Sequence, residues 1–320
     1  MGVASVATSA ISQSASQSAG TGARGGLRAW FLRSENARGY ALMGPTLVIM
    51  FIALAAPLIL LLLYSFWTQE GYTVNTTLTF DRYFDIFVND TSENRLFWTL
   101  FQRSVSISGV VTLVTVLLAY PIAYYVAFHV KKYKFLWLIL LTIPFWTSYL
   151  LRVFAWKIIL GYQGVINSGL QSLGIIDAPL EFLLYNPTSI VITLAHAWAA
   201  FAILPIYVSL EKIDRTLLEA AADLGDGPWR RFWRITFPLS MPGVISAAVL
   251  IFVPTTGDYV TPELVGGTQG KMLANLIQIQ FGKSNDWPLG AALALSGLAF
   301  VGLIVVFTVA AFRAAVSRVR

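Results

Sequence analysis

A carboxylate stands beside an aromatic ring at Asp258-Tyr259, within a stretch that is otherwise apolar. An ionisable side chain in a membrane-length apolar segment is costly, so such a residue is a candidate for function. A carboxylate and a ring together suit an ammonium group, the first by charge pairing and the second by cation–π attraction. Trp146, Tyr149 and Trp198 lie in other apolar segments and are predicted to add aromatic walls to the same path.

Two other interpretations of these residues stay open. Trp and Tyr near the ends of membrane helices are usually anchors at the bilayer interface. Arg152 lies deep in the same apolar segment as Tyr149 and needs a partner. Asp258 is a candidate for that partner, which would make its role structural. The sequence does not choose between a carboxylate that meets a ligand and one that pairs with Arg152.

A second group of residues occupies the stretch EAAADLGDGPWRRFWRITFPLS, from 219 to 240. Asp214 is predicted to cap a short helix, and Gly225 fits the left-handed position that ends a helix. Pro228 suits the first position of a second helix. The rings of that second helix recur at helical spacing, and its arginines lie off the stripe, which is typical of a helix at a membrane interface.

The first of these two helices offers a surface for another protein. Ala220 and Ala221 are small enough to let a second backbone approach, and Glu219 places a negative charge beside them. The alternative is a loop anchored on lipid without a partner.

The elements that must position these groups are membrane helices. The chain has 320 residues, of which 57% are hydrophobic and 12% charged. That charged fraction is about half of what a soluble domain carries. Several apolar runs approach the ~20 residues that cross a bilayer as a helix. Six spans are predicted, at Ala41–Trp67, Leu100–Phe128, Phe135–Leu160, Ser189–Leu210, Gly243–Pro262 and Leu289–Phe312.

The charges outside the spans predict the topology. Lys and Arg gather in alternate connecting segments and at both ends, whereas Asp and Glu gather in the others. Basic segments stay on the cytoplasmic side, so both termini and the 211–242 loop are expected to be cytoplasmic. We therefore expect a disordered basic tail over 1–38, a transmembrane domain over 39–315 that contains the 211–242 loop, and a short cytoplasmic tail over 316–320.

Several functional classes are disfavoured by what the sequence lacks. There is no cysteine, so neither a disulfide nor a thiolate metal site is possible, and two histidines are too few for a metal cluster. Known catalytic motifs are absent, and so is a phosphate-binding loop for ATP, because Ile277 stands where the first glycine before "GKS" would be. We expect no cofactor, no metal and no enzymatic activity.

The 219–240 stretch resembles the EAA loop of bacterial ABC-importer permeases. The matching residues are Glu219, Ala220, Ala221, Gly225, Ile235 and Pro238. Phe237 stands where that family has Leu, which is a mild departure. The resemblance implies that the helix at Glu219 couples transport to a separate ATPase, which supplies the ATP hydrolysis that this chain lacks.

Further segments are similar to the spermidine/putrescine permeases, over roughly residues 40 to 315. They include PFWTSYLLRVFAWKIIL (144–160), GVINSGLQSLGIIDAPLEFLLYN (164–186) and GDYVTPELVGG (257–267). This resemblance implies an all-α integral membrane protein with the type I ABC importer (MetI-like) permease fold.

The same resemblance implies an assembly and a location. The expected partners are a cytoplasmic ATPase dimer, a second and different permease, and a solute-binding protein outside the bacterial inner membrane. A polyamine is the first expectation for the solute. The alternative within the same family is another small amine or a related solute. An ion-gradient-driven carrier is the alternative class, but such carriers often show paired broken helices and internal repeats, and the sequence shows one broken span and no obvious repeat.

Overall fold

The computed structural model describes residues 35–71 and 73–317. Contacts within the chain divide it into two units, residues 1–61 and 62–320. Most of the predicted basic tail and the last three residues of the chain lie outside the described residues. Helix α3 (Glu35–Tyr64) overlaps the last four residues of that predicted tail, and it contains Pro45 and Pro57.

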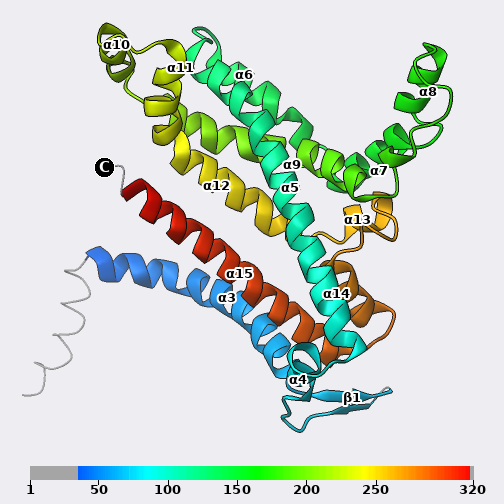
Figure 1. The fold of residues 1–320 in the computed structure, drawn as a ribbon. Coiled ribbons are helices and arrows are strands. Elements are labelled where there is room, and N and C mark those ends of the chain that lie inside the picture. Colours follow the sequence, from blue (N-terminus) through cyan, green and yellow to red (C-terminus); the bar gives the residue numbers. More distant parts are fainter. Residues whose placement is uncertain (1–34, 72, 318–320) are drawn as a thin grey trace, which may run out of the picture. The chain divides into compact units, whose positions relative to one another are not determined.

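The core of the second unit is formed by three long helices that pack along one another: α5 (Ser92–Phe128), α9 (Pro187–Glu211) and α12 (Phe237–Thr256) (Figure 1). Their sequences are apolar over a membrane-length run, and side chains cap two of their starts. Thr91 accepts a hydrogen bond from the backbone N–H of Asn94 at 3.2 Å, and Asn186 closes a capping box with Ser189 at the start of α9.

Small residues let these helices approach closely. Gly243 of α12 lies against the carbonyl of Pro205 and the side chain of Ser209 in α9, where any Cβ would clash. Between α5 and α12, the hydroxyl groups of Tyr120 and Ser240 are 2.8 Å apart. Membrane helices commonly associate through small residues and interhelical hydrogen bonds, because lipid removes the hydrophobic drive between helices.

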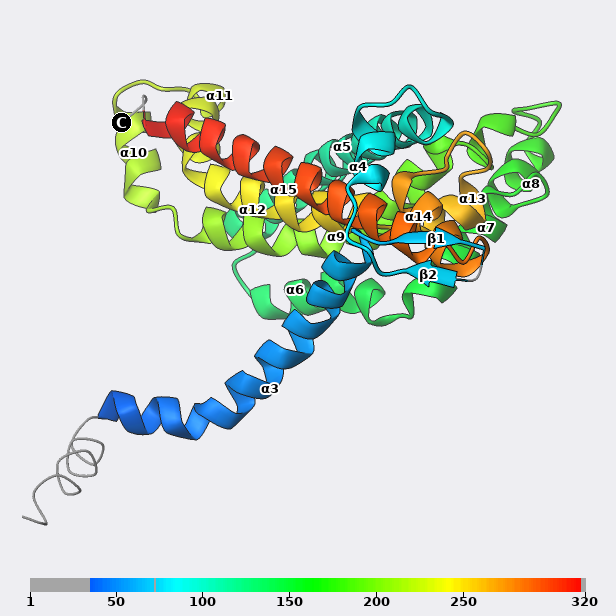
Figure 2. The same cartoon turned by 90° about the horizontal axis from the view of Figure 1, so that it is seen from below.

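A second packed cluster joins the start of α5 to the last helices. It includes α4 (Asp81–Phe87), α14 (Leu273–Gly282) and α15 (Trp287–Ser317), with a short hairpin of β1 (Thr68–Glu70) and β2 (Thr73–Asn75) (Figure 2). Arg82 pairs with Asp286 at 3.1 Å and fixes α4 to the start of α15. The backbone N–H of Leu273 donates to the Ser104 hydroxyl at 2.8 Å, which fixes α14 to α5.

The remaining elements connect these helices. They are α6 (Lys134–Thr142), the 3₁₀ turn η1 (Ile143–Trp146), α7 (Tyr149–Leu160), α8 (Val165–Ser172), the 3₁₀ turn η2 (Glu181–Leu183), α10 (Arg215–Asp223), α11 (Pro228–Arg231), the π-helical turn η3 (Phe232–Thr236) and α13 (Val260–Val265).

Two predicted spans differ from the observed helices. The third, expected as one helix over Phe135–Leu160, is broken at Thr147 and Ser148, whose backbone is extended. Pro144 lacks a backbone N–H and starts a 3₁₀ turn just before the break. The fifth, expected to reach Pro262, ends as a helix at Thr256, and a separate helix α13 follows.

The described residues contain six helical segments long and apolar enough to cross a membrane. This number agrees with the prediction, but the third segment is Tyr149–Ser172, whereas Lys134–Trp146 is a shorter apolar helix. The fifth is longer on its N-terminal side than expected, because α11, η3 and α12 follow one another without an interruption from Pro228 to Thr256. The last part of the predicted 211–242 loop is therefore helix.

Candidate functional site

The 211–242 region forms a compact structure at one end of the second unit (Figure 1). Asp214 caps α10, because its carboxylate accepts a hydrogen bond from the Thr216 N–H at 3.0 Å. That hydrogen bond lowers the pKa of Asp214. Gly225 ends the helix with φ at +86°, as predicted for a left-handed position, and Pro228 opens α11.

Basic side chains hold this region in place. Arg231 donates to the Leu218 carbonyl at 3.3 Å, and Arg234 pairs with Asp226 at 3.2 Å. Lys134 donates to the carbonyl of Ala127, near the end of α5. It also pairs with Glu211, at the end of α9, at 2.8 Å. Cations at helix C-termini donate to carbonyls that lack a helical partner, and they interact favourably with the helix dipole. Arg215, the first residue of α10, donates to the Ala127 carbonyl at 3.3 Å and so connects α10 to α5.

The exposed face of α10 differs from the predicted one. Ala221 is buried, at 7% exposure, whereas Glu219 and Ala220 are exposed. Leu217 and Leu224 are also exposed, at 49% and 88%. The free surface of α10 is therefore formed by two leucines as well as by a small residue and a carboxylate.

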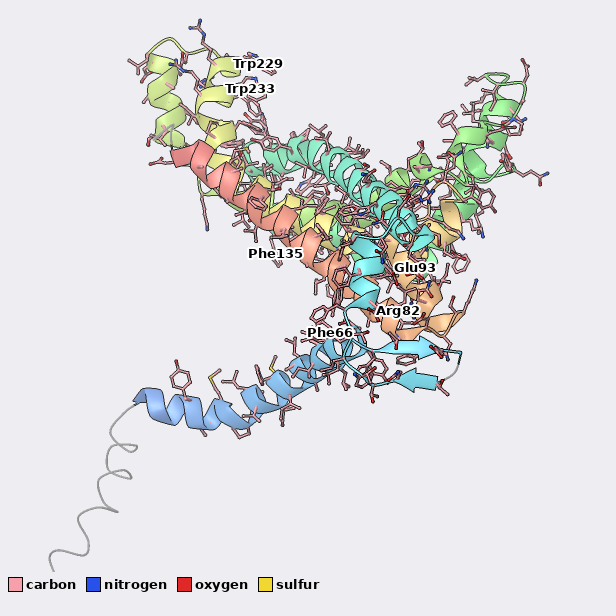
Figure 3. All side chains as sticks on the ribbon, turned by 60° about the horizontal axis from the view of Figure 1, so that its bottom comes forward. Phe66, Arg82, Glu93, Phe135, Trp229 and Trp233 are labelled. Atoms are coloured by element: carbon pink, nitrogen blue, oxygen red, sulfur yellow. The ribbon has the colours of Figure 1, made fainter. Side chains whose placement is uncertain are left out.

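An aromatic cluster follows α10. Trp229 and Trp233 project from α11 and η3 near this end of the molecule (Figure 3). Phe232 packs between them and Tyr120 of α5, with ring centroids 5.2 to 6.1 Å apart. Ile235 in η3 and Pro238 at the start of α12, the last two residues of the motif, are half-buried. The π-helical turn relieves the clash that the Pro238 ring would make with the carbonyl four residues earlier in a regular α-helix.

The second group of predicted residues lies at the two helix breaks. Asp258 occupies the gap between α12 and α13 and is half-buried. Its Oδ1 accepts hydrogen bonds from the N–H groups of Val260 and Thr261, at 2.9 and 3.3 Å, and so caps α13. Its Oδ2 accepts a hydrogen bond from the Tyr149 hydroxyl at 2.6 Å. The structure therefore brings Tyr149 and Asp258 together.

Arg152 does not pair with Asp258. Its guanidinium donates to the carbonyls of Phe145 and Thr147, at 3.1 and 3.0 Å, and to Ala197 of α9 at 3.0 Å. The first two carbonyls belong to the break in the third span, where no helical partner is available to them. The alternative in which Asp258 serves only as the partner of Arg152 is thus wrong for this structure.

Two cavities lie near these residues. One, of about 270 Å³, contains Trp198 and Tyr149 together with Arg152. The other, of about 610 Å³, contains Tyr259 together with Phe281 and Trp287, whose ring centroids are 5.7 Å apart.

Of the aromatic residues predicted for the path, Tyr149 and Trp198 line the smaller cavity and Tyr259 lines the larger one. Trp146 lines neither cavity and is 84% exposed. Phe281 and Trp287 were missed by the sequence reasoning, because each stands near a helix end, where a ring normally predicts an interfacial anchor.

Known proteins are similar to this chain in sequence and in fold. Residues 110–320 match the family described as "Binding-protein-dependent transport system inner membrane component". The spermidine/putrescine transport system permease protein PotB of Haemophilus influenzae is 34% identical over 78% of this chain and 85% of its own length. PotB of Escherichia coli is also 34% identical, over 75% of this chain and 85% of its own length.

A solved structure supports the fold independently. The crystal structure of a bacterial ABC transporter involved in the import of the acidic polysaccharide alginate matches with a TM-score of 0.66 at 18% identity, over 89% of this chain and 98% of that one. The predicted fold of an ABC-importer permease is therefore confirmed. With this fold, six membrane-length helices and a family match over 110–320, the chain belongs to the family of inner membrane components of binding-protein-dependent transport systems.

Proposed function

We propose that this chain is a permease subunit of an ATP-driven importer and that it moves a small cationic solute, with a linear polyamine such as putrescine or spermidine as the first candidate. The similarity to the two PotB proteins supports the polyamine, because it extends over three quarters or more of this chain. The solute would pass by alternating access between two permease subunits.

The observation that supports a cationic solute is the absence of a positively charged partner for Asp258 among the described residues. Its carboxylate is held by neutral donors, namely one phenol and two backbone amides. None of the ion pairs among the described residues includes Asp258. A carboxylate in a partly dehydrated place needs a countercharge. An ammonium group of the solute would supply that charge, and Tyr259, beside it in the chain, would add cation–π attraction.

The exposed face of α10 suits the coupling role that the EAA motif implies. Leu217, Ala220 and Leu224 present an apolar strip on a short helix, and Glu219 adds a charge. An apolar helix face that docks in a groove of another protein is a common recognition mode. The proposed occupant of that face is a cytoplasmic ATPase, with a second permease and an external solute-binding protein completing the assembly.

The test is uptake of labelled putrescine and spermidine by the complete importer in proteoliposomes. Asp258→Asn should lower the uptake of both, and the loss should be larger for spermidine, which carries more amino groups. Asp177→Asn, which removes an exposed carboxylate outside both cavities, is the matched control and should transport normally. If the wild-type complex imports another solute but no polyamine, the polyamine is excluded, whereas the importer assignment stands.

A further inference from the structure

The smaller cavity contains a buried positive charge. It is lined by Phe145, Thr147, Tyr149, Arg152, Ala197 and Trp198. Arg152 is only 8% exposed. A buried guanidinium in a membrane segment is expensive unless it meets carbonyls, a countercharge or a water-filled cavity.

The chain satisfies this guanidinium only in part. The two terminal nitrogens of Arg152 donate to three backbone carbonyls. Carbonyls are dipoles, so they stabilise the group without neutralising its unit charge. No ion pair among the described residues includes Arg152. Within the described part of the chain, Arg152 thus has no carboxylate at ion-pair distance.

Two donors beside this cavity also have no acceptor. They are Nε of Arg152 and the indole Nε1 of Trp198, and both are buried. An arginine and an indole donate hydrogen bonds but accept none, so only an acceptor completes them. Both atoms are covered in this structure, so an acceptor in the cavity reaches them only when one of these side chains moves. The positive charge makes an oxyanion the best such acceptor.

We propose that this cavity is a subsite for the oxyanion end of a solute, a carboxylate in the simplest case. Tyr149 lines the cavity and also donates a hydrogen bond to Asp258, so this side chain contacts both the Arg152 cavity and the Asp258 carboxylate. A short amine with a carboxylate at its other end matches both: the ammonium at Asp258 and the carboxylate at Arg152. This inference rests on the proposed function and widens the solute class from polyamines to amines that end in a carboxylate.

The test uses the absence of cysteine from the chain. Thr147→Cys introduces one thiol at the cavity, within the complete importer. Its modification by an anionic sulfonate-bearing methanethiosulfonate is compared with that by a cationic trimethylammonium analogue, and mass spectrometry of this chain reads the product. A cleft with one sign of charge concentrates ions of the other sign. The anionic reagent should therefore react roughly tenfold faster than the cationic one.

Two further variants connect this preference to Arg152. Adding Arg152→Gln should remove the preference, whereas Arg152→Lys, which keeps the charge, should retain it. Ala274→Cys places the thiol in the aromatic cavity of Tyr259 instead and should not favour the anionic reagent. Equal rates at position 147, or faster reaction with the cation, would overturn the proposal. A thiol that resists both reagents would do so too, because a neighbouring subunit would then fill the cavity.

A second measurement identifies the solute end and does not need Arg152 to be changed. Putrescine and 4-aminobutyrate are similar in length, and a carboxylate replaces one ammonium group in the second. We expect 4-aminobutyrate to protect the Thr147→Cys thiol and putrescine to protect it less. Trp198→Phe keeps an aromatic ring but removes the indole N–H donor, so it should weaken protection by 4-aminobutyrate. Protection by putrescine alone would refute the oxyanion subsite and leave the polyamine proposal intact. Protection by 4-aminobutyrate without any polyamine uptake would do the reverse.

Discussion

At the scale of single residues, the two charges near the helix breaks are stabilised by backbone rather than by each other. Arg152 takes the carbonyl groups that the break after η1 leaves free, whereas Asp258 takes the amide groups at the start of α13. A broken membrane helix offers carbonyls to a cation at one end and N–H groups to an anion at the other. Each charge can thus be held in the apolar layer and still attract a ligand.

Tyr149 restrains Asp258, and its hydroxyl also lies 2.6 Å from the Thr261 hydroxyl. Tyr149→Phe removes the hydrogen bond to the carboxylate, and losing a hydrogen bond to a charged group costs about 1.5–3 kcal/mol. We expect solute uptake to fall while the protein still inserts. Tyr162→Phe, at a residue that is 45% exposed, is the matched control. Equal uptake by both variants would show that the phenol does not position Asp258.

At the scale of elements, the turn after α10 depends on a residue in the left-handed conformation. Gly225 has φ at +86°, and a Cβ there would meet nothing within 4 Å. The obstacle to a side chain at this position is therefore the backbone conformation alone, worth about 1–2 kcal/mol for Ala. Asn tolerates the left-handed region better. Gly225→Ala should weaken coupling of ATP hydrolysis to transport, and Gly225→Asn should do so less.

Gly227 provides the control for that comparison. A Cβ at Gly227 also meets nothing within 4 Å, but φ is −67° there, which any residue adopts. Gly227→Ala should therefore behave as wild type in the same ATPase and uptake measurements. A loss in Gly227→Ala as large as in Gly225→Ala would show that the surface of the turn, rather than its backbone, is what matters.

The contact between α9 and α12 depends on Gly243. A Cβ at this position would stand against the Pro205 carbonyl and 2.5 Å from the Ser209 hydroxyl oxygen. Gly243→Ala should separate the two helices, and overpacking of this kind costs about 1–3 kcal/mol. Thermal unfolding in nanodiscs should show a lower midpoint. Gly302→Ala in α15, where the added methyl meets open space, should leave the midpoint unchanged.

Much at this scale could be predicted from the sequence, because local chemistry decides it. The cap at Asp214, the left-handed Gly225 and the helix start at Pro228 all depend on a few neighbouring residues. The break in the third span was missed, because Thr147 and Ser148 are only a short polar interruption in an otherwise apolar run. The burial of Ala221 was missed as well, since only tertiary packing tells which side of an amphipathic helix is covered.

At the scale of the whole second unit, the 211–242 region and the 68–97 segment lie at different ends. Helices α10 and α11 gather at one end, together with the last turns of α15, whereas α4 and β1 lie at the other (Figures 1 and 2). Arg82 and Glu93 belong to this second end, away from Trp229 and Trp233 (Figure 3). The long helices α9 and α12 connect the regions of the helix breaks to α10 and α11 directly along the chain.

That arrangement makes the predicted topology testable in intact cells. Both termini and the 211–242 region are expected on the cytoplasmic side, and residues 68–97 outside, because Lys and Arg gather in the first set of segments. Leu78→Cys and Lys131→Cys each place one thiol at an exposed position in a chain without native cysteine. A membrane-impermeant maleimide should label the Leu78→Cys variant in intact spheroplasts and the Lys131→Cys variant only after permeabilisation. Labelling of Lys131→Cys before permeabilisation would invert the map and place α10 on the side where no ATPase is available.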